Sequence, residues 1–304
     1  MKGWVLYGLN NLQLEELAAA KPQRGEILVK VKAAGICSSD IQRVYVKGAY
    51  HYPIILGHEF AGETENGRRV SVFPLIPCFK CESCQARHYE TCSNYNYIGS
   101  RRDGAFAEYV AVPEWNLLEI PAHVTFAQAA LFEPAAVALH AVKRLNPGKG
   151  SRVAIIGKGA IGQLAAQWLA NFGVTEIDLL GRNDLPNFEQ YDACLEASGA
   201  REGLRRSIEL TKPNGRLVLV GNPDVDFNID QKLYGQILRK QITLQGSWNS
   251  SYPADWREVR DRAGKLRLDS FISHRYKFRE LDKALAMMRG KKESYRKVIM
   301  DSGK

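Results

Sequence analysis

Four cysteines crowd into a short segment in the first third of the chain. Their spacing is C-x2-C-x2-C-x7-C, and the residues are Cys78, Cys81, Cys84 and Cys92. Four thiolates complete a closed tetrahedral zinc site, and the short spacings let consecutive ligands curl around one ion. Such a site leaves no position open for a substrate. We therefore expect this segment to hold a structural zinc ion that fixes a loop.

Isolated metal ligands in other segments indicate a second zinc site with a different role. Cys37 lies in Gly-Ile-Cys-Ser-Ser-Asp, and His58 lies in Gly-His-Glu. A catalytic zinc takes about three protein ligands and keeps one position open. A carboxylate must complete the set, and both Glu59 and Glu133 are candidates. A lone cysteine is most often a small core residue, so the hypothesis depends on the combination of these motifs.

A glycine motif follows an apolar run in the middle of the chain. Residues 152–156 read Arg-Val-Ala-Ile-Ile, and the G-x-G-x-x-G motif and a helical stretch come next. A motif in that context is typical of a dinucleotide site, in which the glycines permit a tight turn, a close approach of the pyrophosphate and helix–strand packing. The pyrophosphate lies at the helix N-terminus. The predicted binding residues are Gly157, Gly159, Ala160, Ile161 and Gly162.

The segments that carry these motifs differ in their predicted secondary structure. Residues 1–140 contain short alternating runs separated by Gly, Pro and Asn, which predict a β-rich fold. Ala and Leu at helical spacing predict a helix over 127–145, ended by Asn-Pro-Gly. Apolar runs then alternate with helical stretches, which favours a parallel sheet. The later predicted elements are strands at 152–156, 175–180, 192–197, 216–221 and 241–246, a helix near 279–289 and a strand at 297–300.

Composition excludes several classes of protein. The chain has 304 residues, 45% of them hydrophobic and 25% charged, which is globular and suggests two domains. No run approaches the ~18 apolar residues of a spanning helix, and the start lacks a signal peptide's apolar region, so we expect a cytoplasmic protein. The net charge is +9, but the basic residues are scattered. We expect no nucleic-acid or membrane partner and favour an anionic small molecule.

The order of these motifs resembles the zinc-dependent medium-chain dehydrogenase/reductase family, over nearly the whole chain. The resemblance implies an α/β protein with a GroES-like, β-rich catalytic domain that carries zinc, over 1–145 with 273–304. It also implies a Rossmann-type doubly wound parallel sheet over 146–272. Residues 181–191 are too few for the helix and strand that the family places there. We therefore expect the sheet to be trimmed by one βα unit.

The resemblance also assigns the catalytic metal ligands. Cys37 and His58 match the family's catalytic zinc ligands. Glu133 matches the carboxylate ligand of the polyol branch, and Glu59 matches a residue that ligates directly or exchanges during the cycle in some members.

Proton handling is implied by the residues around the first ligand. Ser39 matches the hydroxyl that takes the substrate's proton, and Asp40 matches a partner that orients His58. Gln42 stands where many members have a histidine. A glutamine cannot titrate, so the relay beyond Ser39 must use water or ribose hydroxyls.

The implied function is hydride transfer between a polyol and NAD or NADP, with zinc acting as a Lewis acid. We expect a polyol phosphate, because the chain is basic and adjacent arginines can bind phosphate through paired N–H groups. The candidate substrate contacts are Arg101, Arg102 and, from a segment that shares in the resemblance, Trp248.

Other functions stay open at this point. Within the enzyme class, the substrate could be an unphosphorylated polyol or a secondary alcohol. Outside it, the chain could be a catalytically weak nucleotide-binding regulator or a basic nucleic-acid-binding protein with a structural zinc. Two zinc ions per chain favour the enzyme, and one favours either alternative.

The residues at the end of the second predicted strand indicate the choice of dinucleotide. An acidic residue about 20 positions after the glycine motif selects NAD, but an ungapped count arrives at Gly181 and Arg182, which suggests NADP. A gapped count arrives at Asp178 and restores NAD.

Residues 241–245 would form a sheet edge, and pairing with a second copy would cover it, so we expect a homodimer or higher homo-oligomer.

Overall fold

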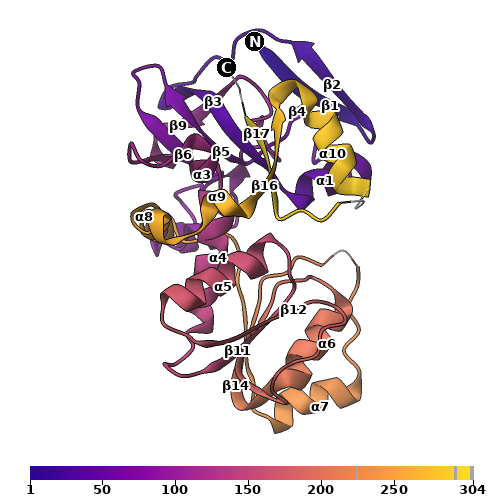
Figure 1. The fold of residues 1–304 in the computed structure, drawn as a ribbon. Helices are drawn as coiled ribbons and strands as arrows, with labels where there is room; N and C mark the ends of the chain where they lie inside the picture. Colours follow the sequence, from indigo (N-terminus) through magenta and orange to yellow (C-terminus); the bar gives the residue numbers. More distant parts are fainter. Residues whose placement is uncertain (224, 291–292, 302–304) are drawn as a thin grey trace. The chain divides into compact units, whose positions relative to one another are not determined.

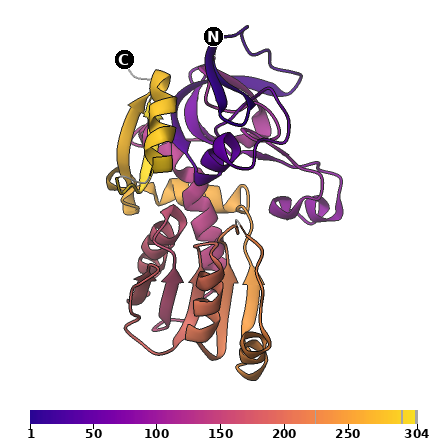
Figure 2. The ribbon, with the colours of Figure 1, turned by 90° about the vertical axis from the view of Figure 1, so that its right-hand side faces the viewer.

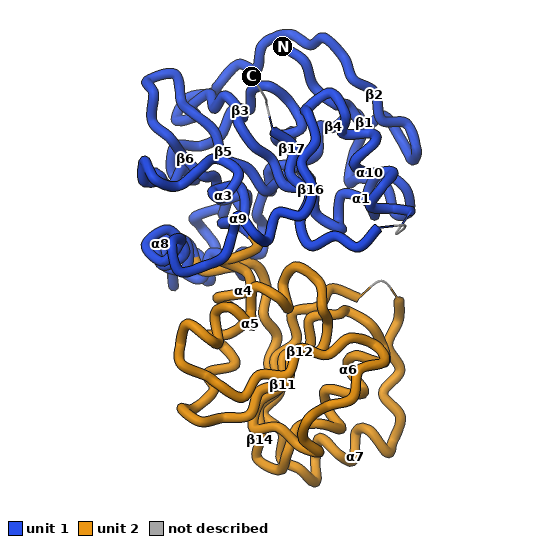
Figure 3. Tube along the Cα trace, in the orientation of Figure 1, with its two compact units in different colours: residues 1–133, 252–304 blue, residues 134–251 orange. Residues whose placement is uncertain are grey.

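The computed structural model describes residues 1–223, 225–290 and 293–301. The chain forms two compact units: unit 1 comprises residues 1–133 with 252–304, and unit 2 comprises residues 134–251 (Figures 1 and 3). This division does not show which unit is catalytic and which binds the nucleotide. The predicted domain ranges therefore stay predictions. None of the helices in the described ranges is long and apolar enough to cross a bilayer.

The largest sheet of unit 1 combines strands from both ends of the chain. Its order is β10-β6-β5-β3-β17-β16, and β9 pairs with β3. β17 pairs antiparallel with β3, with Val298 opposite Ile36. This register brings the last described strand beside the segment that carries Cys37. The strands are β3 (Glu26–Ile36), β5 (Glu59–Thr64), β6 (Arg69–Val72), β9 (Tyr109–Pro113), β10 (Leu117–Glu119), β16 (Ile272–Lys277) and β17 (Lys297–Asp301).

Smaller elements of unit 1 surround this sheet. Three strands form a second sheet, in the order β2-β1-β4, and β7 and β8 pair on either side of the cysteine segment. The strands are β1 (Lys2–Gly8), β2 (Asn11–Glu16), β4 (Ile54–Ile55), β7 (Leu75–Ile76) and β8 (Asn96–Tyr97). The helices are α1 (Ser38–Tyr45), α2 (Glu82–Gln85), α3 (Phe126–Ala130), α8 (Ala254–Asp261), α9 (Leu268–Phe271) and α10 (Leu281–Gly290).

The single helix predicted over 127–145 is two helices. α3 ends at Ala130, and α4 (Phe132–Leu145) begins after Leu131. Pro134 lacks the N–H that a continuous helix would donate to Ala130, and proline is tolerated only in a helix's first turn. The break therefore places Glu133 in the first turn of α4.

Unit 2 is built on the predicted parallel sheet. The strand order is β12-β11-β13-β14-β15, and each neighbouring pair is parallel. Figure 2 shows these strands side by side with helices packed against them. The strands are β11 (Arg152–Ile156), β12 (Glu176–Leu180), β13 (Tyr191–Glu196), β14 (Thr211–Leu219) and β15 (Thr243–Gly246), and the helices are α5 (Ala160–Asn171), α6 (Arg201–Leu210) and α7 (Gln231–Arg239).

The shape of this sheet confirms the trimming expected from the sequence. A full doubly wound sheet carries a further strand outside the one that follows the first helix. Here β12 is an edge of the sheet, and a short loop leads from it directly to β13.

Several strand limits differ from those predicted. β12 begins one residue later, β13 lies one residue earlier, β14 begins at Thr211 instead of residue 216, and β17 ends one residue later. β14 ends at Leu219 because the next two N–H groups both turn to donate to the carbonyl of Glu196. β15 begins at Thr243 because Gln241 has φ +50°, which is incompatible with a strand.

Candidate active site

The four clustered cysteines converge on one point. Their Sγ atoms all lie within 4.8 Å of one another, and the Cys78–Cys84 and Cys81–Cys92 separations are both 3.9 Å. A tetrahedral zinc with bonds of ~2.3 Å has sulfur–sulfur edges of about 3.8 Å. Backbone hydrogen bonds from Cys84 and Ser93 lower the pKa of Cys81 to about 6, which favours the thiolate. These donors therefore fit a closed zinc site.

An aromatic cluster holds this cysteine lobe against the rest of unit 1. The Trp115 ring centroid lies 5.0 Å from those of Phe79 and Tyr89, which belong to the lobe. The same indole lies 4.8 Å from Tyr252 and 6.1 Å from Phe73. Trp115 therefore joins the lobe to the body of the unit.

The second predicted ligand set also converges. Donor atoms of Cys37, His58 and Glu59 lie within 4.8 Å of one another. Cys37 follows β3 and is the N-cap residue of α1, while His58 immediately precedes β5. Gly57 turns the chain into β5 with φ +96°, and a Cβ there would lie 2.7 Å from the Phe106 ring. The Gly-His-Glu motif therefore needs its glycine on both grounds.

Asp40 is completely buried beside the imidazole. One of its carboxylate oxygens accepts a hydrogen bond of 2.9 Å from the Cys37 N–H, and the other lies 3.7 Å from Nδ1 of His58. A carboxylate facing one ring nitrogen leaves the other free for a metal. The structure thus places Asp40 where it can orient His58.

A buried lysine, which the sequence analysis missed, pairs with one of the candidate carboxylates. Lys297, at the start of β17, is 3% exposed and forms an ion pair with the 1% exposed Glu59. Burial alone would lower the pKa of Lys297, but the negative charges of Glu59, Cys37 and Glu133 together outweigh burial, and the pKa is raised. A Cβ at Gly35 would lie 2.2 Å from Oε2 of Glu59, so this glycine makes room for the pair.

The other candidate carboxylate has a tyrosine partner that the sequence analysis also missed. The Tyr97 hydroxyl donates to Oε1 of Glu133 at 3.4 Å, and the Tyr97 ring lies 5.9 Å from the ring of His58. Burial raises the pKa of Glu133 to about 7.

The charges of the cluster fit a divalent cation. Cys37, Glu59, Glu133 and Asp40 supply four negative charges when ionised, and Lys297 supplies one positive charge. Buried charges are strongly destabilising unless they are compensated. The excess of negative charge favours a bound cation, and the thiolate, imidazole and carboxylate donors suit zinc.

The two adjacent arginines have different surroundings. Arg102 forms a 2.8 Å ion pair with Glu26, so its charge is already compensated. The Arg101 guanidinium lies 4.9 Å from the ring centroid of Tyr50 and 4.5 Å from that of Tyr95. Of the predicted phosphate contacts, Arg101 is the one that the structure leaves without an ion pair among the described residues.

Two further predicted contacts are placed as follows. Ser39 is the second residue of α1, two positions after Cys37, and is partly buried. Trp248 follows β15 in unit 2 and its residue is 51% exposed.

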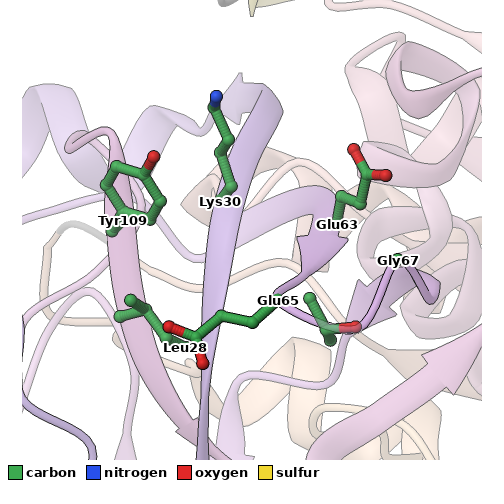
Figure 4. Close-up of a pocket in the computed structure, with 7 residues that line it drawn as sticks. Leu28, Lys30, Glu63, Glu65, Gly67 and Tyr109 are labelled. Carbon is green, nitrogen blue, oxygen red and sulfur yellow. The ribbon is translucent and has the colours of Figure 1, made fainter.

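A separate pocket lies beside strands β3, β5 and β9. Figure 4 shows Lys30 between Tyr109 and Glu63, with the ammonium 5.9 Å from the tyrosine ring. The pocket is lined by Leu28, Lys30, Glu63, Thr64, Glu65, Gly67 and Tyr109. None of these is a predicted site residue, so this pocket is not the candidate active site.

The glycine motif of unit 2 forms a cradle after β11. Gly157 has φ +123°, and a Cβ at Gly162 would lie 1.9 Å from its carbonyl oxygen. These two glycines are required by the protein's own packing. Gly159, the N-cap residue of α5, has no atom within 4 Å of a Cβ position. Its missing side chain serves nothing within the chain and leaves room for a pyrophosphate, so the cradle fits a dinucleotide.

The structure at the end of β12 supports the ungapped count from the glycine motif over the gapped count. Asp178 is buried and accepts hydrogen bonds from the Asn187 backbone and side chain and from the Tyr191 hydroxyl. Its carboxylate is therefore occupied within the protein. Gly181 and the exposed Arg182 follow the last residue of the strand, where the ungapped count placed them.

Comparisons with known proteins agree with this geometry. Residues 23–122 match the alcohol dehydrogenase GroES-like domain, and residues 181–265 match the zinc-binding dehydrogenase family. The chain is 33% identical over 304 residues to galactitol 1-phosphate 5-dehydrogenase of Escherichia coli K12, which covers 86% of this chain and 88% of that protein.

Solved structures give the same result over the full length. The crystal structure of galactitol-1-phosphate dehydrogenase from Escherichia coli superposes with a TM-score of 0.89 at 29% identity, covering 99% of this chain and 100% of that one. A zinc-binding dehydrogenase from Sinorhizobium meliloti 1021 bound to NADP superposes with a TM-score of 0.89 at 26% identity, covering 99% and 98%.

The chain therefore belongs to the zinc-dependent medium-chain dehydrogenases, a family of alcohol and polyol oxidoreductases. The GroES-like and Rossmann-type fold expected from the resemblance is confirmed.

Proposed function

We propose that this chain interconverts a polyol phosphate and the corresponding ketone, with NAD or NADP. The observation that carries the proposal is the cluster of Cys37, His58 and Glu59, whose donor atoms converge, in the same unit as an arginine that is held against tyrosine rings. The name of the galactitol 1-phosphate relative supports the substrate class.

In this proposal Cys37, His58 and one carboxylate hold the catalytic zinc. Lys297 already compensates the charge of Glu59, so Glu133 is the proposed third ligand. Glu59 lies close enough to the other donors to exchange with it. When bound, zinc polarises the substrate hydroxyl as a Lewis acid, and the nicotinamide accepts the hydride.

The chain's own groups orient the ligands and carry the proton. Asp40 orients the ring of His58 from the side of Nδ1, which leaves Nε2 for the metal. Ser39 accepts the proton of the substrate hydroxyl and passes its own proton to water. Gln42, three residues further along α1, cannot titrate, so water or ribose hydroxyls must continue the relay.

Arg101 is the proposed phosphate ligand. A line of ring contacts leads toward it from the metal cluster: Tyr97 lies 5.9 Å from His58, and Tyr95 lies 6.2 Å from Tyr97. Tyr50 on its other side is 64% exposed. A guanidinium that stacks on ring faces keeps its edge N–H groups available, and these can bind a phosphate in pairs.

Arg101→Ala tests the proposal, with Arg102→Ala as the matched control. Kinetics are measured with a polyol and its phosphate ester. Arg101→Ala is expected to raise KM for the phosphate ester ~10-fold or more and to leave KM for the plain polyol within about twofold, because a charge-assisted bond contributes about 1.5–3 kcal/mol. Arg102→Ala is expected to affect both substrates equally, because Arg102 pairs with Glu26. Equal effects of Arg101→Ala on both substrates would contradict the phosphate assignment.

A further inference from the structure

A compact turn just beyond β12 brings a carboxylate beside the glycine motif. The N–H of Gly181 donates to Oδ2 of Asp184 at 2.9 Å, and Lys158 of the glycine motif forms an ion pair with the same carboxylate. Cδ of Lys158 lies 3.4 Å from the position of a Cβ on Gly181, so the lysine passes over the glycine. Arg206 of α6 donates to the carbonyls of Gly181 and Asp184 and fixes the turn.

This turn lies where a dinucleotide-binding sheet reads the adenosine ribose. The N–H of Gly157 donates to the carbonyl of Leu180 at 2.8 Å, so the glycine motif and the end of β12 are directly joined. In such folds a carboxylate at this point accepts the ribose 2′-hydroxyl of NAD, and a cation binds the 2′-phosphate of NADP. Asp178 is occupied by Asn187 and Tyr191, which leaves Asp184 as the carboxylate at the end of the strand.

We propose that the Asp184–Lys158 ion pair sets the choice of dinucleotide. The Asp184 carboxylate accepts the ribose hydroxyl of NAD while Lys158 stays paired with it. The 2′-phosphate of NADP instead competes with Asp184 for the Lys158 ammonium, and Arg182 adds a second cation to the phosphate. This inference rests on the proposed function only in one respect, which is that the chain binds NAD or NADP.

The exposure of the groups makes this exchange feasible. The side chains of Lys158 and Asp184 are 54% and 39% exposed, and solvent-exposed ion pairs contribute little to stability. Arg182 is exposed, and its side chain forms no ion pair or hydrogen bond with another described residue. A phosphate can therefore replace the Asp184 carboxylate as the partner of Lys158 without loss of a buried interaction.

Asp184→Asn tests the proposal through binding alone. NADH and NADPH are titrated into the purified protein without polyol, and protein fluorescence gives the two Kd values. The asparagine can still accept the Gly181 N–H bond but lacks the charge. We expect NADH to bind more weakly and NADPH more tightly, so that the Kd ratio of NADH to NADPH rises at least ~10-fold. Lys158→Met is expected to weaken NADPH binding selectively.

Asp192→Asn is the matched control. Asp192 pairs with Lys212 and accepts the Arg152 N–H, but it lies at the opposite end of the strands. A Kd ratio within twofold of wild type in Asp184→Asn, or an equal shift in Asp192→Asn, would overturn the inference. Dinucleotide binding without polyol turnover would contradict the proposed function alone, and no binding of either dinucleotide by the wild type would contradict both.

Discussion

At the scale of residues, the candidate catalytic cluster requires a glycine beside it, because a larger residue would not fit there. Gly35 lies on β3 opposite Glu59 of β5, and Ile299 of β17 is its other neighbour. A Cβ at Gly35 would lie 2.2 Å from Oε2 of Glu59 and 3.1 Å from Cε of Lys297. The glycine therefore allows a buried ion pair to form beside the metal donors.

Gly35→Ala is expected to displace Glu59 and to weaken metal binding at the catalytic cluster alone. The added methyl group should lower the free energy of unfolding by about 1–3 kcal/mol, as overpacking does. Thermal unfolding and the zinc content of the purified protein measure both effects. Gly8→Ala is the control, because no atom lies within 4 Å of a Cβ there. Full zinc content and unchanged stability in Gly35→Ala would contradict this account of the pair.

The sequence allowed the candidate metal donors to be named, and three of them converge in the structure, but it did not reveal the groups that surround them. Cys37 and His58 stand out because few residue types bind zinc and their motifs are specific. Lys297 and Tyr97 carry no such local signal. Lys297 reaches the cluster only because β17 pairs with β3, and Tyr97 reaches Glu133 through a contact over 36 positions. Such contacts between distant segments form only in the folded chain, and no local sequence motif predicts them.

At the scale of elements, one glycine of the motif is needed for helix packing, and another is expected to make room for the dinucleotide. Gly162 lets α5 approach the turn after β11, since a Cβ there would lie 1.9 Å from the Gly157 carbonyl oxygen. Gly159 begins the same helix with φ −70°, which any residue can adopt, and open space surrounds its Cβ position. The two glycines should therefore respond differently to the same substitution.

Gly162→Ala is expected to destabilise the protein, by about 2–3 kcal/mol. Gly159→Ala is expected to change stability by only about 0.5 kcal/mol and to weaken NADH binding ~10-fold or more, because the methyl group would occupy the pyrophosphate's place. Chemical denaturation and fluorescence titration measure the two effects. Unchanged NADH binding in a folded Gly159→Ala protein would show that the pyrophosphate does not approach this turn.

Elements were predictable where the pattern was long, and less so at their ends. The run 152–156 is β11 without change, and the short segment after β12 correctly indicated a trimmed sheet. The break between α3 and α4 depends on the one N–H that Pro134 lacks. The late start of β15 depends on the backbone of Gln241, whose positive φ no sequence pattern specified.

At the scale of the whole molecule, unit 2 exposes a strand edge with apolar neighbours. β15 pairs with β14 on one side, and within the described residues no strand covers its other side. Leu244 on this strand is 41% exposed, and the nearby segment also exposes Tyr234 and Leu238 by more than half. Open apolar edges promote association, and pairing with a second copy is a common cover.

We therefore expect a homodimer that forms through β15. Light scattering at micromolar concentration should give twice the mass of the chain for the wild type. Leu244→Lys should give the monomer mass, because a charge on an edge strand opposes pairing. Lys232→Gln, which alters an exposed residue at the start of α7, is the control and should remain dimeric. A monomeric wild type would reject the expectation.

The zinc content of the purified chain and of two variants tests the central claim most directly. We expect two zinc ions per wild-type chain, one in each cluster of donors. Cys37→Ser should retain the lobe's ion and the fold but lose turnover, whereas Cys81→Ser should lose the lobe's ion and unfold at a lower temperature. A wild-type chain that holds one zinc ion, and still holds it in Cys37→Ser, would contradict the catalytic site and the oxidoreductase chemistry proposed for it.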